Sequence, residues 1–159
     1  MTDVFLLLGS NLGDRQAYLQ QAIAHIEQEI APVVARSSVY ETQSWGKTDE
    51  PDYLNQVIQL QTNIPAKGIL YKILNIEKAM GREREVKWGS RIIDIDILFY
   101  GSEVINEDQL IVPHPELHNR MFTLAPLAEI APELSHPVLK KNIARLKREL
   151  KSNLHVKKL

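Results

Sequence analysis

Cysteine is absent from this 159-residue chain, which excludes disulfide bonds and thiolate metal sites and is typical of proteins in a reducing compartment. No apolar run approaches the about 20 residues that a membrane-spanning helix needs, and Met1-Thr2-Asp3 does not resemble the start of a signal peptide. Neither sign of charge is in excess, since the chain has 19 Lys and Arg residues and 20 Asp and Glu residues. We therefore expect a cytoplasmic protein with no nucleic-acid partner and no membrane partner.

Two familiar nucleotide-binding motifs are also missing. The chain has no Gly-x4-Gly-Lys-Ser/Thr phosphate loop and no Gly-x-Gly-x-x-Gly dinucleotide fingerprint. The segment Gly9–Gly13 follows a strand-like run and precedes a helix-like one, but its spacing fits neither motif. Any nucleotide site must therefore be built from other residues.

Two acids, Asp94 and Asp96, interrupt the longest strand-like apolar run, Ile92–Tyr100. Because successive side chains of a strand point to opposite faces, the two carboxylates share one face and lie about 6–7 Å apart along the chain. Burying such a pair is costly without a partner, and a hard cation such as Mg²⁺ that carries phosphates would be one. The alternative is the outward face of a half-solvated sheet, and this segment alone leaves both interpretations open.

The segment just before this strand, residues 81–91, is rich in cations. They are Arg82, Arg84, Lys87 and Arg91. Gly81 is typical of a helix end, so the segment is expected to be a loop leading into the acidic strand. Arginine matches phosphate oxygens in a bidentate way, and phosphoryl transfer depends mostly on positioning and charge neutralisation. The alternative is a solvated surface loop, since Glu83 and Glu85 alternate with the arginines.

The hydrophobic pattern predicts four strands and two long helices. The strands are expected at Val4–Leu8, Val33–Tyr40, Tyr53–Asn63 and Ile92–Tyr100. The helices are expected from the Asp14 cap to about Ile30 and from Pro65 to Met80. The order β-α-β-β-α-β predicts a single α+β domain over residues 1–159, a ferredoxin-like sandwich with an added C-terminal hairpin and helices.

The C-terminal part is harder to assign. A hairpin is expected around Gly101–Val104 and a last helix near Leu139–Leu150. The basic tail after Leu150 is expected to fray.

Eight short motifs, spread in order over nearly the whole chain, carry a family resemblance. They are Gly9–Gly13, Tyr40–Thr42, Pro51–Asn55, Gly81-Arg82-x-Arg84, Trp88–Leu98, Val112–Pro115, Asn119–Phe122 and Ala125–Leu127. With these motifs the chain resembles the 6-hydroxymethyl-7,8-dihydropterin pyrophosphokinase family of the folate pathway. The resemblance implies that the β,γ-diphosphoryl group of ATP moves to the hydroxymethyl oxygen of the pterin and that AMP is released. It implies small-molecule substrates only, and we expect a monomer or weak homodimer.

The resemblance also implies a role for each matching residue. Asp94 and Asp96 would bind two Mg²⁺ ions, while Arg82 and Arg91 would neutralise charge on the transferred group. The residues expected to contact ATP are Glu77 at the ribose, Ile97 at adenine, and Arg84, Lys87, Trp88, Arg91, His114 and Arg120. The residues expected to contact the pterin are Thr42, Gly46, Tyr53, Asn55, Trp88 and Phe122.

The pterin contacts can also be inferred from the residues themselves. Tyr53 and Asn55 are two positions apart on an expected strand and so face the same side. A flat, amide-rich heterocycle needs an aromatic face for stacking and a side-chain amide for its edge. With Phe122 as the second ring, the pterin would lie between two aromatic side chains. The alternative is that Tyr53 and Phe122 are core aromatics and that Asn55 is a hydrogen-bonded residue at a strand edge.

Several positions depart from the family pattern. Ser90 replaces the usual proline, and Leu74 stands where many members carry a glutamine that reaches the ribose. Gln109 and Ile111 stand where some members have Arg and Thr near adenine, so backbone recognition of adenine is expected instead. None of these changes removes a residue of the catalytic set.

Two other functions share parts of this pattern. A ferredoxin-like RNA-binding module has the same element order, but the aromatic Lys/Arg-Gly-Phe signature of such modules is absent. A Mg²⁺-dependent phosphohydrolase could use the same two acids, and it would release phosphate without an acceptor.

Overall fold

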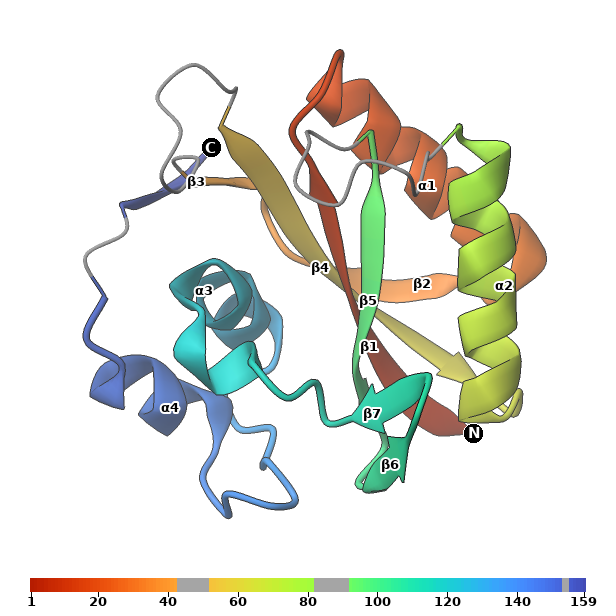
Figure 1. Cartoon of the computed structure of the whole chain (residues 1–159). Helices are drawn as coiled ribbons and strands as arrows, with labels where there is room; N and C mark the ends of the chain where they lie inside the picture. The colour runs from red at the N-terminus through yellow and green to blue at the C-terminus, as the bar shows by residue number, and fades with distance from the viewer. Residues whose placement is uncertain (43–51, 82–91, 153–154) are drawn as a thin grey trace.

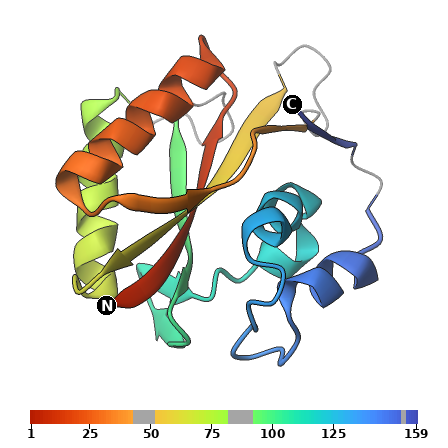
Figure 2. The ribbon, with the colours of Figure 1, turned by 180° about the vertical axis from the view of Figure 1, so that it is seen from behind.

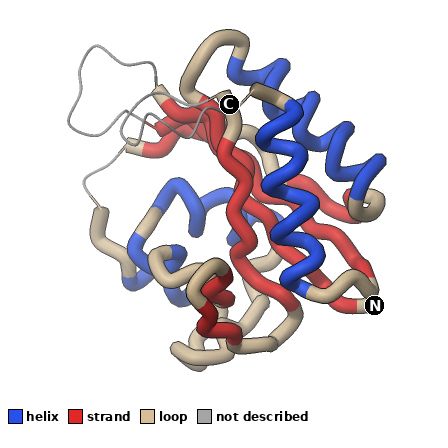
Figure 3. Tube along the Cα trace, turned by 45° about the vertical axis from the view of Figure 1, so that its right-hand side comes forward, coloured by secondary structure: helices blue, strands red, loops and turns tan. Residues whose placement is uncertain are grey.

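A central antiparallel sheet lies between two pairs of helices in the computed structural model, which describes residues 1–42, 52–81, 92–152 and 155–159 (Figure 1). Five strands follow one another across the sheet, in the order β5 (Asp94–Tyr100), β1 (Thr2–Ser10), β4 (Tyr53–Thr62), β3 (Tyr40–Thr42) and β8 (Val156–Lys158). The short strand β2 (Val33–Arg36) also pairs with β4. The strands β6 (Ile105–Glu107) and β7 (Leu110–Val112) form a separate hairpin (Figure 3).

Helices cover both faces of the sheet, as the front and back views show (Figure 1 and Figure 2). One face carries α1 (Arg15–Glu29) and α2 (Ala66–Ala79), and the other carries α3 (Met121–Ile130) and α4 (Ile143–Glu149). A short 3-10 turn, η1 (Leu117–Asn119), precedes α3. Across the described ranges, none of the helices has both the length and the apolar sequence that crossing a bilayer requires.

Each pair of helices encloses its own apolar core, and β1 contributes to both because its side chains alternate between the faces. Leu6 and Leu8 lie in the core beneath α1 and α2, whereas Phe5 and Leu7 lie in the core beneath α3 and α4. The same alternation assigns the residues of neighbouring strands to a face, except at a register shift in β5, where the consecutive residues Leu98 and Phe99 both lie in the core beneath α3 and α4. The structure therefore confirms the coarser part of the predicted fold class, a mixed α/β fold with an antiparallel sheet.

Short-range chemistry explains where α1 and α2 begin and end. Asp14 caps α1, because its side-chain oxygen accepts the N–H of Ala17 at 3.2 Å. Pro65 precedes α2, and Gly81 follows it with φ at +87°, a conformation that glycine adopts without strain. Both helices agree with the sequence-based bounds to within one residue at each end.

The strand expected over Val33–Tyr40 is wrong, because the chain forms two strands, β2 and β3, with a break between them. At the break, the Ser37 hydroxyl takes the place of a backbone acceptor and receives the N–H of Val57 at 3.0 Å. The hairpin expected around Gly101–Val104 is also misplaced. Residues 101–104 form a turn that leads away from β5, and the hairpin closes between Glu107 and Leu110.

The expectation that the tail after Leu150 frays is wrong for its last residues. Strand β8 pairs with β3, with Val156 opposite Thr42 and Lys158 opposite Tyr40 (Figure 2). The tail thereby covers backbone groups of β3 that would otherwise form an open sheet edge.

The carboxylate of Glu129 ties helix α3 to the start of β3. It accepts the Tyr40 hydroxyl at 2.7 Å and the Ser38 hydroxyl at 2.9 Å, and Lys158 lies 3.8 Å away. Burial acts to raise the pKa of Glu129, but the hydrogen bonds from Tyr40 and Ser38 outweigh it and leave the pKa below its ordinary value. Burial, together with this carboxylate, raises the pKa of Tyr40 to about 12.

Replacing Glu129 by glutamine should remove an acid-sensitive part of the stability. A carboxyl group whose pKa is lowered by folding stabilises the protein above its unfolded pKa, about 4.3 for glutamate, and this contribution is lost as the pH falls through the folded pKa. Urea denaturation should therefore show the unfolding free energy of the parent falling more steeply in acid than that of Glu129→Gln. Glu103→Gln, in the exposed turn after β5, is the control and should follow the parent. Parallel pH profiles for the parent and Glu129→Gln would contradict the assignment.

Candidate active site

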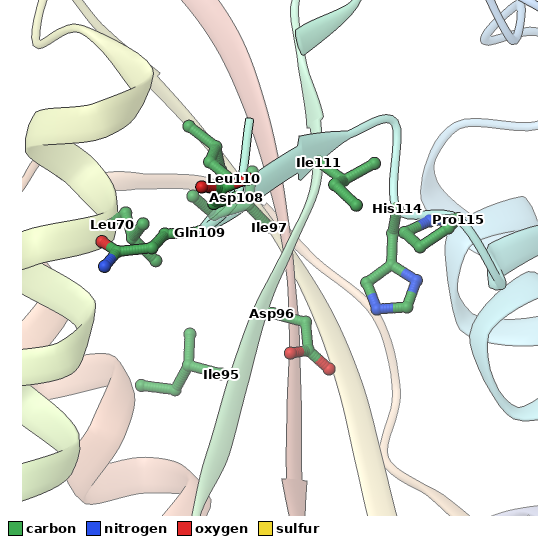
Figure 4. A pocket seen from close by; sticks show the side chains of 10 residues that line it. All are labelled: Leu70, Ile95, Asp96, Ile97, Asp108, Gln109, Leu110, Ile111, His114 and Pro115. Atoms are coloured by element: carbon green, nitrogen blue, oxygen red, sulfur yellow. The ribbon is translucent and has the colours of Figure 1, made fainter. Parts of the chain in front are cut away.

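Asp94 and Asp96 lie on the same face of β5, the face turned toward α3, and both are half-buried. Ile95 and Ile97, which alternate with them, are buried on the other face against α1 and α2. In Figure 4 Asp96 points to one side of β5, whereas Ile95 points to the other, toward α2. The strand therefore presents two carboxylates to one side and anchors itself in the core by the other.

The register of β1 aligns two residues of the expected site with a glycine in one row across the sheet. Gly9 of β1 lies opposite Asp94 of β5 on one side and opposite Asn55 of β4 on the other. With neighbouring strands about 4.8 Å apart, Asp94 and Asn55 are separated by about 10 Å of sheet whose middle residue has no side chain. The row thus has a carboxylate at one end and an amide at the other, with no side chain between them.

Gly9 leaves the space that the Asn55 side chain occupies. A Cβ atom at position 9 would lie 2.9 Å from Nδ2 of Asn55, which is closer than side-chain atoms pack. Asn55 is 5% exposed, and its Nδ2 donates to the carbonyl oxygen of Leu8 at 3.4 Å. The glycine therefore sets the position of the amide.

Thr42 and Tyr53 pair with each other across β3 and β4, in the register that also pairs Tyr40 with Asn55. This register places all four residues on the face turned toward α3. Within the described part of the chain, the buried hydroxyl of Thr42 has no hydrogen-bond partner. Such a group costs free energy unless another group binds it, so Thr42 marks a polar contact point at this end of the sheet.

Helix α3 brings Arg120 and Phe122 to the same face. Arg120 is the residue before α3, and its guanidinium carbon lies 5.6 Å from the centre of the Phe122 ring. This geometry is a cation–π contact. Phe122 is half-buried against the core beneath α3, so it restrains the arginine while keeping one part of its ring accessible.

A cavity of about 240 Å³ opens between β5, α2 and the β6–β7 hairpin (Figure 4). Its lining is polar at one end, where Asp96 and His114 lie, and otherwise mostly apolar. The residues that line it are Leu70, Ile95, Asp96, Ile97, Asp108, Gln109, Leu110, Ile111, His114 and Pro115. A cavity of this size would hold part of a nucleotide, such as a base, with the remainder extending past Asp96.

His114 is held at the polar end of this cavity by its own backbone and ring. Its N–H donates to the carbonyl of Leu98 at 3.0 Å, and its ring Nδ1 accepts the N–H of Glu116 at 3.1 Å. Burial lowers the pKa of His114 below its ordinary value, although the nearby Asp96 carboxylate acts in the opposite direction. The ring is therefore neutral near pH 7 and carries its proton on Nε2, where it can be donated to an acceptor.

Glu77 lies against the acidic strand. Its side chain is 3% exposed, and its carboxylate accepts the N–H of Ile95, the residue between the two aspartates, at 2.9 Å. Glu77 thus stabilises β5 at the outer edge of the sheet. Its expected contact with a ribose stays a prediction.

Several expected site residues lie outside the described ranges. They are Gly46, Arg82, Arg84, Lys87, Trp88 and Arg91, together with Ser90 among the departures from the family pattern. Their roles stay predictions.

The structure also adds residues to the cavity that sequence reasoning missed. Leu70 lines it from α2, one turn before Leu74, and Asp108, Leu110 and Pro115 line it from the hairpin and the segment that follows. Placing the hairpin at residues 105–112 would have identified Asp108, Leu110 and Pro115, because the turn of the hairpin then lies next to β5.

The two aspartates are the only expected metal ligands. Among the described residues, His, Asp and Glu side chains do not gather in a group of three or more that could hold a metal ion by themselves. Mg²⁺ is commonly held by one or two carboxylates together with substrate phosphates and water. Two half-buried carboxylates on one face, beside a cavity large enough for a nucleotide base, fit that pattern.

A family model and individual relatives of known name point to the same protein family. A family model described as 7,8-dihydro-6-hydroxymethylpterin-pyrophosphokinase (HPPK) matches residues 5–132. The chain is 44% identical over 131 residues to 2-amino-4-hydroxy-6-hydroxymethyldihydropteridine pyrophosphokinase of Bacillus subtilis. The aligned region covers 82% of this chain and 78% of the relative. The chain is 43% identical over 149 residues to the protein of the same name from Aquifex aeolicus, which covers 94% and 92%.

Solved structures agree on the fold. The wild-type HPPK-DHPS structure of Plasmodium falciparum matches with a TM-score of 0.74 at 19% identity, which at that identity shows a shared fold only. The match covers 94% of this chain and 43% of the other, so this chain spans less than half of that protein. Strand β8 and helix α4 lie beyond residue 132, where the family match ends.

Gly9→Ala should displace the Asn55 amide while leaving the fold intact, because the added methyl group meets the far end of a side chain and not the backbone. The side-chain NH₂ signal of Asn55 should shift in a ¹⁵N–¹H correlation spectrum, with the rest of the spectrum largely preserved. Gly68→Ala on α2, where the nearest atom is a methyl group of Ile64, is the control and should leave the Asn55 signal in place. An unchanged Asn55 signal in Gly9→Ala would show that the glycine is not needed there.

Proposed function

The chain belongs to the 7,8-dihydro-6-hydroxymethylpterin-pyrophosphokinase family and transfers diphosphate from ATP to the hydroxymethyl group of the dihydropterin in folate synthesis, and we propose that Asp94 and Asp96 hold two Mg²⁺ ions for this transfer. The observation that carries the proposal is the row Asp94, Gly9 and Asn55 across β5, β1 and β4. It supports a site in which the acceptor lies over the sheet and reaches the carboxylates at one end.

The pterin is proposed to bind above Gly9. The side-chain amide of Asn55 would hydrogen-bond the polar edge of the ring, and Tyr53 and Phe122 would stack on its two faces. The about 10 Å between Asn55 and Asp94 accommodates a two-ring heterocycle lengthwise. The hydroxymethyl group would then point toward Asp94.

ATP is proposed to enter from the other side of the carboxylates. Its adenine would occupy the cavity beneath the β6–β7 hairpin, next to the backbone of Ile97. The polar end of that cavity would direct the phosphates toward Asp96 and His114. The neutral imidazole donates one hydrogen bond through Nε2 to a phosphate oxygen, and Arg120 adds a positive charge.

The reaction needs positioning and charge neutralisation more than covalent chemistry from the protein. The hydroxymethyl oxygen gives up its proton to solvent and bonds to the β-phosphorus. The bond from that phosphorus to the oxygen bridging to the α-phosphorus breaks, and AMP leaves with that oxygen. When bound, Mg²⁺ ions at Asp94 and Asp96 neutralise phosphate charge and align the groups that react. Arg82 and Arg91 are proposed to neutralise the transferred group, and Arg84, Lys87 and Trp88 to contact ATP.

The topology of the fold, the location in the cell and the oligomeric state are also proposed. The strand order β5-β1-β4-β3, with α1 and α2 on one face, supports a ferredoxin-like core within one domain of residues 1–159. The absence of cysteine supports a location in the cytoplasm. A monomer or weak homodimer that binds small molecules is proposed with it.

The products of the reaction test this function against a phosphohydrolase that uses the same acids. The protein is mixed with ATP, Mg²⁺ and 6-hydroxymethyl-7,8-dihydropterin, and nucleotides and pterins are separated by chromatography. AMP that forms only with the pterin, matched by an equal amount of pterin diphosphate, is the expected result. ADP or free phosphate that forms without pterin would leave the metal site standing and exclude the substrate assignment.

Asp96→Asn should abolish most turnover with little effect on folding, because the neutral amide keeps the shape of the side chain but loses its charge. Outer-shell changes at metal sites cost roughly 10–100-fold, so a direct ligand should cost more than that. Asp3→Asn makes the same change at an exposed position of β1, where the carboxylate bonds Gln59 and Gln61, and should keep parental turnover. If Asp96→Asn keeps activity within a few-fold of the parent, the metal assignment is wrong.

A further inference from the structure

Arg15, the first residue of α1, bridges two segments of the sheet with one nitrogen atom. Its Nη1 donates to the carboxylate of Glu41 at 3.2 Å and to the backbone carbonyl of Asp52 at 2.6 Å. The Arg15 and Glu41 side chains are 28% and 29% exposed, so the ion pair is partly shielded from water. Charge-assisted hydrogen bonds in such surroundings hold geometry more firmly than neutral ones.

The two partners of Arg15 are next to pterin-site residues. Glu41 directly precedes Thr42 at the end of β3, and Asp52 directly precedes Tyr53 at the start of β4. The register pairs Glu41 with Leu54 and Thr42 with Tyr53. The guanidinium therefore joins the ends of two strands at the point where the site residues pair.

Arg15 acts from the face of the sheet opposite to the substrate. Leu54 lies in the core beneath α1 and α2, so Glu41, its partner, points toward α1. Thr42 and Tyr53 alternate with these residues and point to the other face. Arg15 is thus placed to fix the backbone beneath Thr42 and Tyr53 without touching a ligand.

We propose that Arg15 is a positioning residue for the pterin site, acting through Glu41 and Asp52 to hold Thr42 and Tyr53 in place. This inference rests on the proposed location of the pterin. A stacking ring contributes most to affinity when its position is set before the ligand binds, because the cost of ordering it is then already met. Loss of Arg15 should weaken pterin binding in particular, since the nucleotide cavity is built from β5, α2 and the hairpin.

The test compares Arg15→Met and Arg15→Lys with the parent in steady-state kinetics. Arg15→Met keeps a long apolar stem but removes both hydrogen bonds. The KM for the pterin should rise at least about tenfold, because the loss of a single charge-assisted hydrogen bond can account for a change of that size. The KM for ATP and kcat at saturating pterin should stay close to those of the parent. Arg15→Lys retains a charged nitrogen that can reach one or both acceptors, and it should recover much of the loss.

A matched control and a second variant keep the test decisive. Arg145→Met removes another arginine–glutamate pair, with Glu149 on α4, and should leave all three constants unchanged. Glu41→Gln weakens the pair from the other side, so its effect on the KM for the pterin should not add to that of Arg15→Met. This variant also serves if Arg15→Met does not fold.

The outcomes separate this inference from the proposed function. A parental KM for the pterin in Arg15→Met and Glu41→Gln, in an enzyme that makes pterin diphosphate, would overturn the role of Arg15 alone. Equal changes in both KM values with a lowered melting temperature would show a purely structural role and also overturn it. Failure of the parent chain to make pterin diphosphate would instead overturn the proposed function.

Discussion

The backbone pairing of β1 with its two neighbours is the interaction on which the rest of this structure depends. One register places Gly9 between Asp94 and Asn55, and the alternation of side chains at this end of β5 then puts the two aspartates on one face and Ile95 and Ile97 on the other. A slip by one residue would turn the carboxylates into the apolar core and the isoleucines toward the substrate. The buried apolar side chains on both faces of β1 oppose such a slip, so the cores that stabilise the fold also maintain the chemistry of the site.

Polar contacts at the strand ends complete what the register begins. Glu77 binds the backbone between the two aspartates, Glu129 binds the start of β3, and Arg15 joins the ends of β3 and β4. All three side chains belong to helices that pack on the sheet. Each one bonds a group at a strand end or edge that does not pair with a neighbouring strand. Charged side chains suit this role because their hydrogen bonds are stronger than neutral ones, provided that they stay partly shielded. The helices therefore do more than cover apolar surface, since they also set the position of the strands that carry the site.

Much of the fold could be predicted from the sequence, because its information is local. The cap at Asp14, the proline before α2 and the alternation of Asp94 and Asp96 with isoleucines each act over a few residues. The errors concern features that depend on distant partners. The break between β2 and β3 depends on a Ser37 contact with β4, and the ordered tail depends on the free edge of β3. The hairpin is expected too early in the chain because the local sequence does not distinguish the turn after β5 from the turn that joins β6 and β7.

The sequence by itself determined the family, the pairing of the two carboxylates on one face and the identity of most residues expected to bind substrate, because motif order and strand periodicity are properties of the chain alone. Only the tertiary structure decided that Gly9 separates Asp94 from Asn55, that the hairpin closes a cavity over Ile97, and that Arg15 bridges Glu41 and Asp52. These relations join residues far apart in the chain. They arise from strand register and from helix packing against the sheet, and neither follows from local sequence.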